Sequence, residues 1–411
     1  MFENWRASMA VDSEATDPLP GRIDFHNTEF AFAHLSDREL KRMYYLFRLM
    51  NSPALVNVGS SLLVAAIRLR LPLVKRLVRH TIFRQFVGGE TLQECEPVIE
   101  KLRKYQCSSI LEYGAEGKSR EEELDATRDI VLNTIRFAAS SDSVPVVSLK
   151  LTGLVDNALL EKKQRGEVFS EQEDVYWKRF LRRFDDICQT AYEHNIALFI
   201  DAEESWMQDA IDALVLERMR RYNTRRAILY NTYQLYRVDG LQRLKDDYRA
   251  IHSEGYVFGA KLVRGAYMDK ERKRAKEMGY PSPIHPTKAA TDRAYDEAIL
   301  FCVEHFETMA SCNASHNLKS NALQAKLIEE RGIVKNHDHL NFSQLYGMAD
   351  YITFNLSARG YNVAKYLPYG PVEEVLPYLI RRARENTAVT GDMSRELKYL
   401  RRELKRRGLL R

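Results

Sequence analysis

Two adjacent arginines near the C-terminus form the sharpest chemical feature of this 411-residue sequence. Tyr378, Arg381 and Arg382 are spaced i, i+3 and i+4, so they share one face if the segment is helical. Two guanidinium groups beside a phenol can bind a carboxylate bidentately. The spacing alone fits equally well an exposed arginine pair that bridges to acids such as Glu385.

A second group of polar residues follows short apolar runs that are far apart in the sequence. If these runs are parallel strands of a barrel, the residues after them gather at one end, where barrels carry their chemistry. Charges of both signs there are costly unless they pair with one another or with a polar ligand. Their wide spread along the chain suits a large ligand that crosses the whole mouth. The residues are Glu116, Lys150, Asp201, Glu203, Gln234, Lys261, Arg264, His316 and Asn317.

The elements that must position these residues alternate along the chain. Long charged stretches with helical periodicity, such as 121–139, 171–194 and 287–304, separate the apolar runs. Eight runs interleaved with helices predict a parallel α/β protein, and the count of eight favours a closed (β/α)8 barrel over an open sheet. Only about ten residues separate the last two runs, near the minimum for a parallel crossover. The predicted strands are 108–111, 144–151, 196–200, 227–230, 257–263, 308–314, 340–342 and 351–355.

The segments outside the barrel are expected to be helical. Residues 1–104 read as an N-terminal helical arm, with a capping box at Thr91 and Glu94. Residues 62–83 mix apolar and basic side chains; packing on the main domain is favoured over an anionic membrane surface. The barrel is expected over 105–390, and a basic, solvated helix over 391–411.

Composition and motifs exclude several function classes. The formal charge of +5 is small against 119 charged side chains, which gives no case for nucleic acid. Five cysteines without a CxxC pair argue for a reducing compartment and against a disulfide framework or zinc ribbon. No GxGxxG occurs, 114–119 lacks the earlier glycine of a phosphate loop, and His337 and His339 precede a strand, at the stability end of a barrel. No metal site is predicted.

The N-terminal residues do not read as a targeting signal. Residues 1–30 hold six acids and two arginines, unlike secretory or transit peptides. The longest apolar stretch, 53–67, is too short and interrupted to span a bilayer. The sequence therefore predicts a cytoplasmic protein, with peripheral contact at the inner face of the membrane as an open option.

Seven separated segments together resemble proline dehydrogenase, the flavin-dependent family of proline catabolism. The resemblance covers roughly 105–390, and the Tyr/Arg/Arg helix is specific to the family. It implies a (β/α)8 barrel whose last helix sits over the mouth, and FAD bound without a covalent link. The segments are 147–152, 199–204, 231–234, 261–267, 286–292, 314–317 and 366–386. The segment Lys-Leu-Val-Arg at 261–264 resembles the eukaryote-like branch of the family. Many bacterial relatives have arginine at the position of Lys261.

The resemblance also implies roles for individual residues. Arg381 and Arg382 are expected to hold the carboxylate of proline, with Glu116 pairing to this clamp. Tyr366 and Tyr378 are expected to wall the pyrrolidine ring. The expected catalytic residues are Lys150, Asp201 and Lys261, with Lys150 and Asp201 beneath the substrate. The expected flavin contacts are Ile200, Gln234, Arg264, Gly265, Ala266, Tyr267, Ser315 and His316. Either Lys261 or Arg264 is expected to place its cation at the flavin pyrimidine.

The activity implied is oxidation of L-proline to 1-pyrroline-5-carboxylate, the first step of proline catabolism to glutamate. Hydride passes to FAD and the electrons pass on to a quinone, since no nicotinamide site is visible. The chain is expected to be monofunctional, without a second domain to oxidise the product. Tyr366 would crowd a hydroxyl on the ring, which favours proline.

Alternatives remain open at this stage. They are a hydroxyproline dehydrogenase, another FAD-dependent barrel such as a methylenetetrahydrofolate reductase, and a basic membrane or nucleic-acid adaptor. The adaptor would bind anionic surfaces with a strong salt dependence and show no flavin absorbance.

Overall fold

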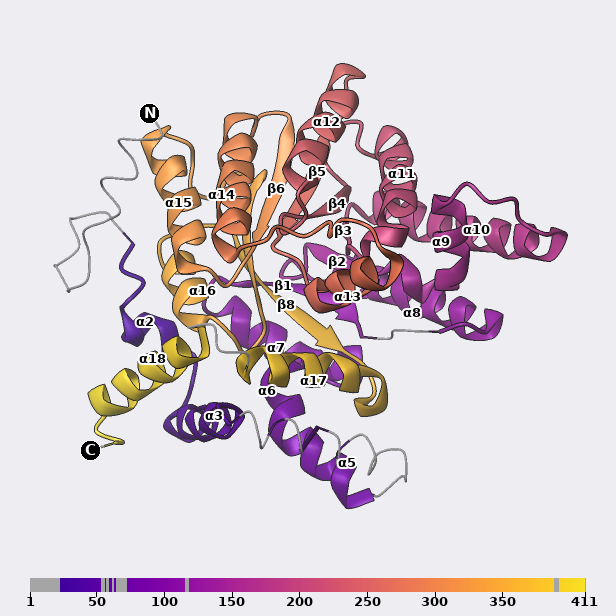
Figure 1. The fold of residues 1–411 in the computed structure, drawn as a ribbon. Helices are drawn as coiled ribbons and strands as arrows, with labels where there is room; N and C mark the ends of the chain where they lie inside the picture. The colour runs from indigo at the N-terminus through magenta and orange to yellow at the C-terminus, as the bar shows by residue number, and fades with distance from the viewer. Residues whose placement is uncertain are drawn as a thin grey trace.

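Eight parallel strands close into a barrel in the computed structural model of the chain (Figure 1). Each strand pairs with the next, and β8 pairs with β1 over the full length of β1, from Ser108↔Ala364 to Tyr113↔Tyr369. The strands are β1 Ser108–Tyr113, β2 Val146–Leu149, β3 Ala197–Ile200, β4 Leu229–Gln234, β5 Phe258–Val263, β6 Met309–Ala314, β7 Leu340–Leu345 and β8 Val363–Tyr369. This architecture confirms the predicted (β/α)8 barrel. The structure describes residues 23–52, 56, 59–60, 63, 72–114, 118–387 and 392–410.

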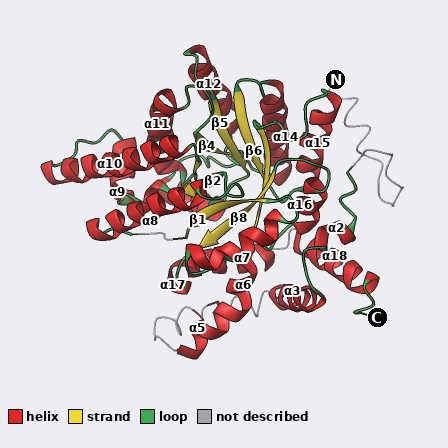
Figure 2. Cartoon of the chain, turned by 180° about the vertical axis from the view of Figure 1, so that it is seen from behind, coloured by secondary structure: helices red, strands yellow, loops and turns green. Residues whose placement is uncertain are grey.

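Helices follow the strands and surround the barrel, as the view from behind shows (Figure 2). Several of these helices begin at a capping residue. At α10, the Ser170 side chain accepts from the backbone N–H of Glu173, and the Glu173 carboxylate accepts from the backbone N–H of Ser170, which forms a capping box. The helices are α8 Glu121–Ala139, α9 Asn157–Gln164, α10 Glu171–His194, α11 Ser205–Tyr222, α12 Gly240–Ser253, α13 Met268–Met278, α14 Lys288–Glu304, α15 Leu318–Glu330, α16 Asp350–Ser357 and α17 Val372–Thr387, with a 3₁₀ turn, η2, at Leu151–Gly153.

The predicted eighth strand is wrong. Residues 351–355 lie inside α16, and the true last strand, β8, follows it. Every residue of α16 is buried, so the helix has no solvent-exposed face, and no alternation of exposed and buried residues reveals its period of 3.6. Lys365 and Pro368 disguised the real strand by interrupting its apolar run. Lys365 is 1% exposed and is neutralised by Asp350, with Nζ 2.7 Å from Oδ1.

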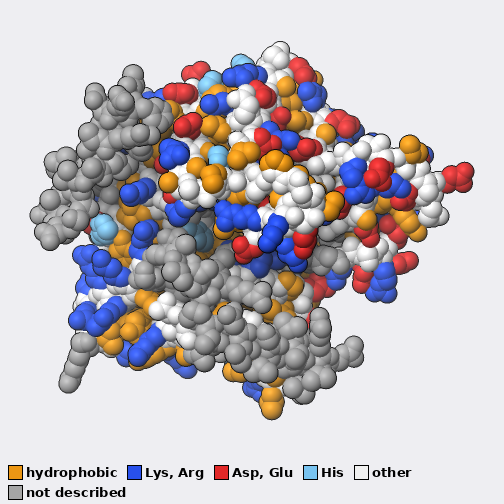
Figure 3. All heavy atoms as spheres, viewed as in Figure 1, with side chains coloured by type: hydrophobic (Ala, Val, Ile, Leu, Met, Phe, Trp, Pro, Cys, Tyr) orange, Lys and Arg blue, Asp and Glu red, His pale blue; other side chains and the backbone are white. Residues whose placement is uncertain are grey.

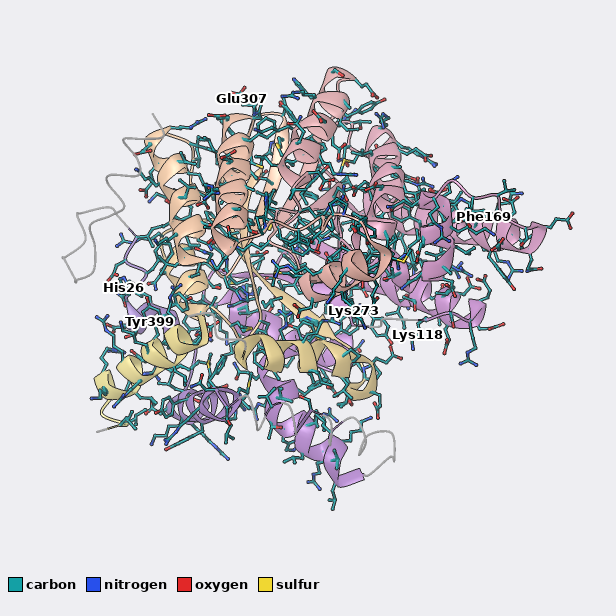
Figure 4. The ribbon with its side chains drawn as sticks, viewed as in Figure 1. His26, Lys118, Phe169, Lys273, Glu307 and Tyr399 are labelled. Atoms are coloured by element: carbon teal, nitrogen blue, oxygen red, sulfur yellow. The ribbon has the colours of Figure 1, made fainter. Side chains whose placement is uncertain are left out.

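Helices from both ends of the chain pack beside the barrel. The described N-terminal helices are α2 Thr28–Phe32, α3 Asp37–Met50, α5 Pro72–Val78, the π-helical turn η1 Arg79–Phe83, α6 Arg84–Phe86 and α7 Leu92–Arg103. The C-terminal helix α18, Asp392–Arg406, buries Leu400 and Leu404 instead of standing free in solvent. His26 and Tyr399 face each other between α2 and α18, with 2.8 Å between Nδ1 and the phenol oxygen (Figure 4).

No helix in the described part of the chain is both long and apolar enough to cross a membrane.

Candidate active site

The barrel interior carries apolar side chains along its length and polar ones at its C-terminal end. Its apolar filling includes Ile110, Phe199, Tyr230 and Cys312, all buried. Because strand side chains alternate between the two faces of the sheet, Ser148 and Lys261 project on the same side as this filling. The interior is therefore a packed core that turns polar near the mouth.

Asp201 is the centre of the polar cluster under the mouth. It directly follows β3, and its carboxylate accepts from the ammonium of Lys261 at 2.6 Å, the phenol of Tyr366 at 2.8 Å and the hydroxyl of Ser148 at 2.8 Å. The Lys261 Nζ also lies 4.9 Å from the centroid of the Tyr366 ring, within cation–π range. Three strands besides β3 thus contribute side chains to one carboxylate.

Charge pairing decides the protonation state of this cluster. Burial alone would raise the pKa of Asp201, but the Lys261 cation and the hydrogen bonds from Lys261 and Tyr366 lower it below its ordinary value. Burial and the Asp201 charge together raise the pKa of Tyr366 well above its ordinary value. At neutral pH Asp201 is therefore ionised and the phenol of Tyr366 is neutral.

Glu203, two residues after Asp201, forms a separate cluster on the rim. Its carboxylate accepts the hydroxyl of Thr152 through one oxygen and the phenol of Tyr267, at 2.6 Å, through the other. Its backbone carbonyl accepts from Nε2 of Gln234 at 2.7 Å. Burial raises the pKa of Glu203, opposed by the Lys150 charge and by the two hydroxyls. The sequence placed Glu203 at a strand end but gave it no role.

The two candidate cations on β5 and just after it point to different places. Lys261 lies in the barrel interior and is 5% exposed. Arg264 instead reaches toward α14 and α15, donating to Asp292 at 2.8 Å, Ser315 at 2.7 Å and Ser320 at 2.9 Å. Its guanidinium lies 4.3 Å from the ring centroid of Tyr295. Lys261 thus places its charge inside the barrel, and Arg264 places its charge on the side of α14 and α15.

The turn after Arg264 depends on a glycine. Gly265 has φ +132°, and a Cβ there would lie 2.4–2.5 Å from ring atoms of Tyr236. Ala266 is exposed in this turn, and Tyr267 is the N-cap residue directly before α13. Because the turn packs closely against Tyr236, the backbone at Tyr267 is held in place, and from there its phenol reaches Glu203.

Ser315 and His316 follow β6 on the same rim. The Ser315 hydroxyl accepts from Arg264 and from the Asn317 backbone N–H at 3.0 Å. His316 accepts the Leu345 backbone N–H through Nε2 at 3.0 Å. Burial, with the Lys365 and Arg382 charges, lowers the pKa of His316 to about 3, so the ring is neutral at pH 7.

Helix α17 brings the Tyr/Arg/Arg face beside this rim. Tyr378 is buried, and Arg381 and Arg382 are half-buried. The Arg382 guanidinium lies 5.3 Å from the Tyr378 ring centroid, and its charge reaches His316, where it contributes to the lowered pKa. The start of the helix is anchored to β1, since Glu374 accepts from the phenol of Tyr113 at 2.9 Å.

Three predicted site residues differ in how they relate to these clusters. Lys150 is half-buried where β2 passes into η2, and its charge acts on both Asp201 and Glu203. Ile200 is fully buried, and its side chain packs in the outer core while its backbone belongs to the ladder. Glu116 lies outside the described residues. Sequence reasoning missed Ser148, although its position two residues before Lys150 puts both on the same side of β2.

The described residues contain no group of three or more His, Cys, Asp or Glu side chains able to hold a metal. His337 and His339 lie just before β7, where the His339 Nδ1 is 2.7 Å from the Phe306 carbonyl.

Comparisons with known proteins agree on one family. The family model described as proline dehydrogenase matches residues 95–395. Proline dehydrogenase 1, mitochondrial, of Dictyostelium discoideum is 35% identical over 80% of this chain, and the human protein of that name is 41% identical over 58%. The chain spans 65% of the Dictyostelium protein and 40% of the human one. A hydroxyproline dehydrogenase of Xenopus laevis is 33% identical, covering 90% of this chain and 88% of the relative.

Solved structures agree on the fold. Proline utilization A from Bdellovibrio bacteriovorus, inactivated by N-propargylglycine, superposes with a TM-score of 0.71 at 22% identity, covering 96% of this chain and 41% of that one. On the family model and the relatives together, the chain belongs to the proline dehydrogenase family.

Proposed function

We propose that this chain oxidises L-proline to 1-pyrroline-5-carboxylate, with non-covalently bound FAD as the first electron acceptor. The observation that carries the proposal is the Asp201–Lys261–Tyr366 cluster under the mouth, with the face of Tyr378, Arg381 and Arg382 beside the rim. An amino acid needs a cationic group for its carboxylate, a wall for its apolar ring and a polar floor for its amine. These residues supply all three.

Each part of this chain has a defined task in that proposal. Arg381 and Arg382 bind the carboxylate, which fixes the position of the ring carbon next to nitrogen. Tyr366 and Tyr378 wall the ring. Asp201 and Lys261 neutralise each other, so the floor is polar without a net charge that would repel the substrate. The nearby cations and the dry site lower the pKa of the proline amine, which favours the neutral form.

The residues of the rim fit a flavin dinucleotide. Arg264 offers a guanidinium beside the Ser315 hydroxyl, where a pyrophosphate would meet positive charge and a donor. The exposed Gly265–Ala266 backbone, Tyr267, Gln234, the Ile200 backbone and neutral His316 complete the proposed contacts. Bound FAD accepts the hydride. We assign Lys261 to the substrate side and Arg264 to the phosphate side because their side chains point apart.

Hydroxyproline is a second candidate substrate. A hydroxyproline dehydrogenase relative covers 90% of this chain. Tyr366 argues for proline, because its phenol is tied to Asp201 and its ring to Lys261, which leaves it little freedom to yield to a ring hydroxyl. The ratio of kcat/KM for the two substrates decides between them.

We also propose a quinone as final acceptor and contact with a membrane surface. Helix α5 exposes Leu73 by 79% and Leu77 by 65%, with Arg76 and His80 exposed beside them. Apolar side chains are visible at this lower end of the molecule (Figure 3). Because Lys75 and Arg79 are bound to Glu373 and Glu94, the contact would rest mainly on the two leucines.

The proposed compartment is the cytoplasmic face of a membrane, as the sequence suggests; the names of several relatives place those relatives in mitochondria. We further propose residues 1–104, 105–390 and 391–411 as the units of the chain.

A spectrum tests the proposed activity directly. The purified protein, reconstituted with FAD, should absorb in the visible region and lose that absorbance when proline is added without oxygen. Arg381→Met should raise the proline KM steeply while FAD stays bound. A preparation that binds no FAD, or one that proline does not reduce, would contradict the proposal.

A further inference from the structure

Glu203 is hydrogen-bonded to residues of two other loops at the mouth, and the proposed function gives it no role. Its side chain bridges Thr152, two residues after Lys150, and Tyr267, at the start of α13. These partners belong to the loops after β2 and β5, and Glu203 itself follows β3. We propose that Glu203 is a positioning residue that sets the phenol of Tyr267 and the loop of Lys150 for the reaction. This inference rests on the proposed function.

The backbone of Glu203 is held as firmly as its side chain. Its N–H donates to Oε1 of Gln208 at 2.6 Å, and Gln208 in turn donates to the buried Asp212 at 2.7 Å. Its carbonyl accepts from Gln234 at 2.7 Å. Because its backbone N–H and carbonyl are both hydrogen-bonded, Glu203 has little freedom to move, and its carboxylate holds the groups that donate to it in fixed positions. Gln234 receives its orientation from the same residue.

The charge of the carboxylate sets the direction of both side-chain hydrogen bonds. An ionised carboxylate only accepts, so the hydroxyls of Thr152 and Tyr267 must both donate to it. The phenol oxygen of Tyr267 then has only lone pairs left for any further partner. A glutamine at 203 would add an N–H that one of the hydroxyls must accept, which breaks this pattern without changing the size of the side chain.

The neighbouring acid shows that this arrangement is particular to Glu203. Glu204 is also buried, but its carboxylate pairs with the Lys270 ammonium at 2.6 Å, and the Lys270 side chain is 66% exposed. Glu204 contacts neither hydroxyl in the hydrogen bonds of the described residues. It therefore serves as a matched control: same charge, same loop, different partner.

A double-mutant cycle tests the proposal on the full chain loaded with FAD. Glu203→Gln should lower kcat/KM for proline about tenfold, and in a Tyr267→Phe background the same change should cost less than about twofold. Glu204→Gln should change kcat/KM by less than about twofold. Additive losses from Glu203→Gln and Tyr267→Phe, or no loss from Glu203→Gln alone, would overturn the role.

Two further measurements keep the outcome clear. The same cycle is read in the Kd for FAD and in urea unfolding of the FAD-free protein. Coupling between positions 203 and 267 that appears in these two measurements but not in kcat/KM would show a merely structural role and overturn the proposal. If Glu203→Gln does not fold, Thr152→Val and Tyr267→Phe replace it, since hydroxyls that share one carboxylate should give non-additive losses. Failure of the proposed function shows differently, as a wild-type flavin that proline does not reduce.

Discussion

Two carboxylates, two residues apart after β3, meet almost the same donors and differ in one partner. Asp201 accepts from Ser148 and Tyr366, and Glu203 accepts from Thr152 and Tyr267: one aliphatic hydroxyl and one phenol in each case. Among the hydrogen bonds of the described residues, Asp201 accepts from an ammonium, that of Lys261, and Glu203 does not. Burial favours the protonated form of both, yet the pKa of Asp201 is lowered and that of Glu203 is raised.

One phenol and one aliphatic hydroxyl are not enough to offset the rise in pKa that burial causes at Glu203. With the added cation of Lys261, the pKa of Asp201 falls below its ordinary value. Two carboxylates in one loop thus differ in how strongly their surroundings favour the ionised form. Environment, and not residue type, separates their roles.

Removing the cation should make Asp201 resemble Glu203, with the largest loss of stability. Lys261→Met leaves a buried carboxylate without its charge partner, so the free energy of unfolding should fall by about 3–5 kcal/mol. Urea unfolding at pH 7 measures it. The control is Lys261→Met combined with Asp201→Asn, which removes both charges and should recover much of the loss. Equal losses in the single and double variants would show that the ion pair is not what stabilises Asp201.

Removing one phenol from each carboxylate should have a medium and unequal effect. Tyr366→Phe and Tyr267→Phe each delete a hydrogen bond to a carboxylate, worth about 1.5–3 kcal/mol. The loss at Tyr267 should be the larger, because within the described part of the chain Glu203 then keeps the hydroxyl of Thr152, while Asp201 still keeps Lys261 and Ser148. Thermal unfolding of the two variants side by side gives the order. A larger loss at Tyr366 would contradict this account of the two sites.

Acid should separate the two carboxylates by sign. The lowered pKa of Asp201 stabilises the folded state above the ordinary value of 3.8, and this gain is lost as pH falls through the folded pKa. The raised pKa of Glu203 does the reverse: its penalty is present at high pH and disappears as pH falls toward 4.5. The charged groups that act on Glu203 are Lys150 and Glu204, with the hydroxyls of Thr152 and Tyr267.

Unfolding free energies at several pH values from 7.5 down to well below 3.8 measure this difference, because Asp201 loses its stabilising effect only below that value. Relative to wild type, Asp201→Asn should become less destabilising as pH falls, and Glu203→Gln more destabilising. Parallel curves for the two variants would mean that burial and pairing do not divide the sites as described.

A partly exposed ion pair should show the smallest effect. Lys118 and Glu374 are 3.2 Å apart beside the start of α17, with side chains about one quarter exposed (Figure 4). Lys118→Met should cost about 0.2–1 kcal/mol, and less in high salt. A loss as large as that of Lys261→Met would contradict the view that burial gives the Asp201 pair its weight.

Strand ends were predictable because a parallel barrel leaves little choice there. The run ending at Ile200 placed Asp201 correctly at the mouth, and Lys150 and Gln234 likewise fall at the ends of their strands. The last strand was not predictable in the same way, since α16 is buried on all sides and β8 contains a charged Lys365. Its ion pair with Asp350 offsets part of the cost of that burial, and a pair between two elements leaves no local pattern in the sequence.

The hydrogen-bond partners of Glu203 could not be predicted from the sequence for a related reason. Asp201 and Glu203 are spaced so that both can turn toward the site, and that spacing is a signal in the sequence. Which hydroxyl each one meets depends on how β2, β5 and β8 sit around β3. Only the closed barrel brings Thr152 and Tyr267 to one carboxylate and Ser148 and Tyr366 to the other.

The pairing of β8 with β1 has a consequence for synthesis of the protein. The floor of the site needs Tyr366 on the final strand, while Ser148 and Asp201 are made much earlier. Until the ribosome has released β8, the early strands have an open edge and Asp201 lacks its phenol. A nascent or truncated chain that lacks β8 should therefore leave the edge of β1 unpaired until the ring of strands is complete.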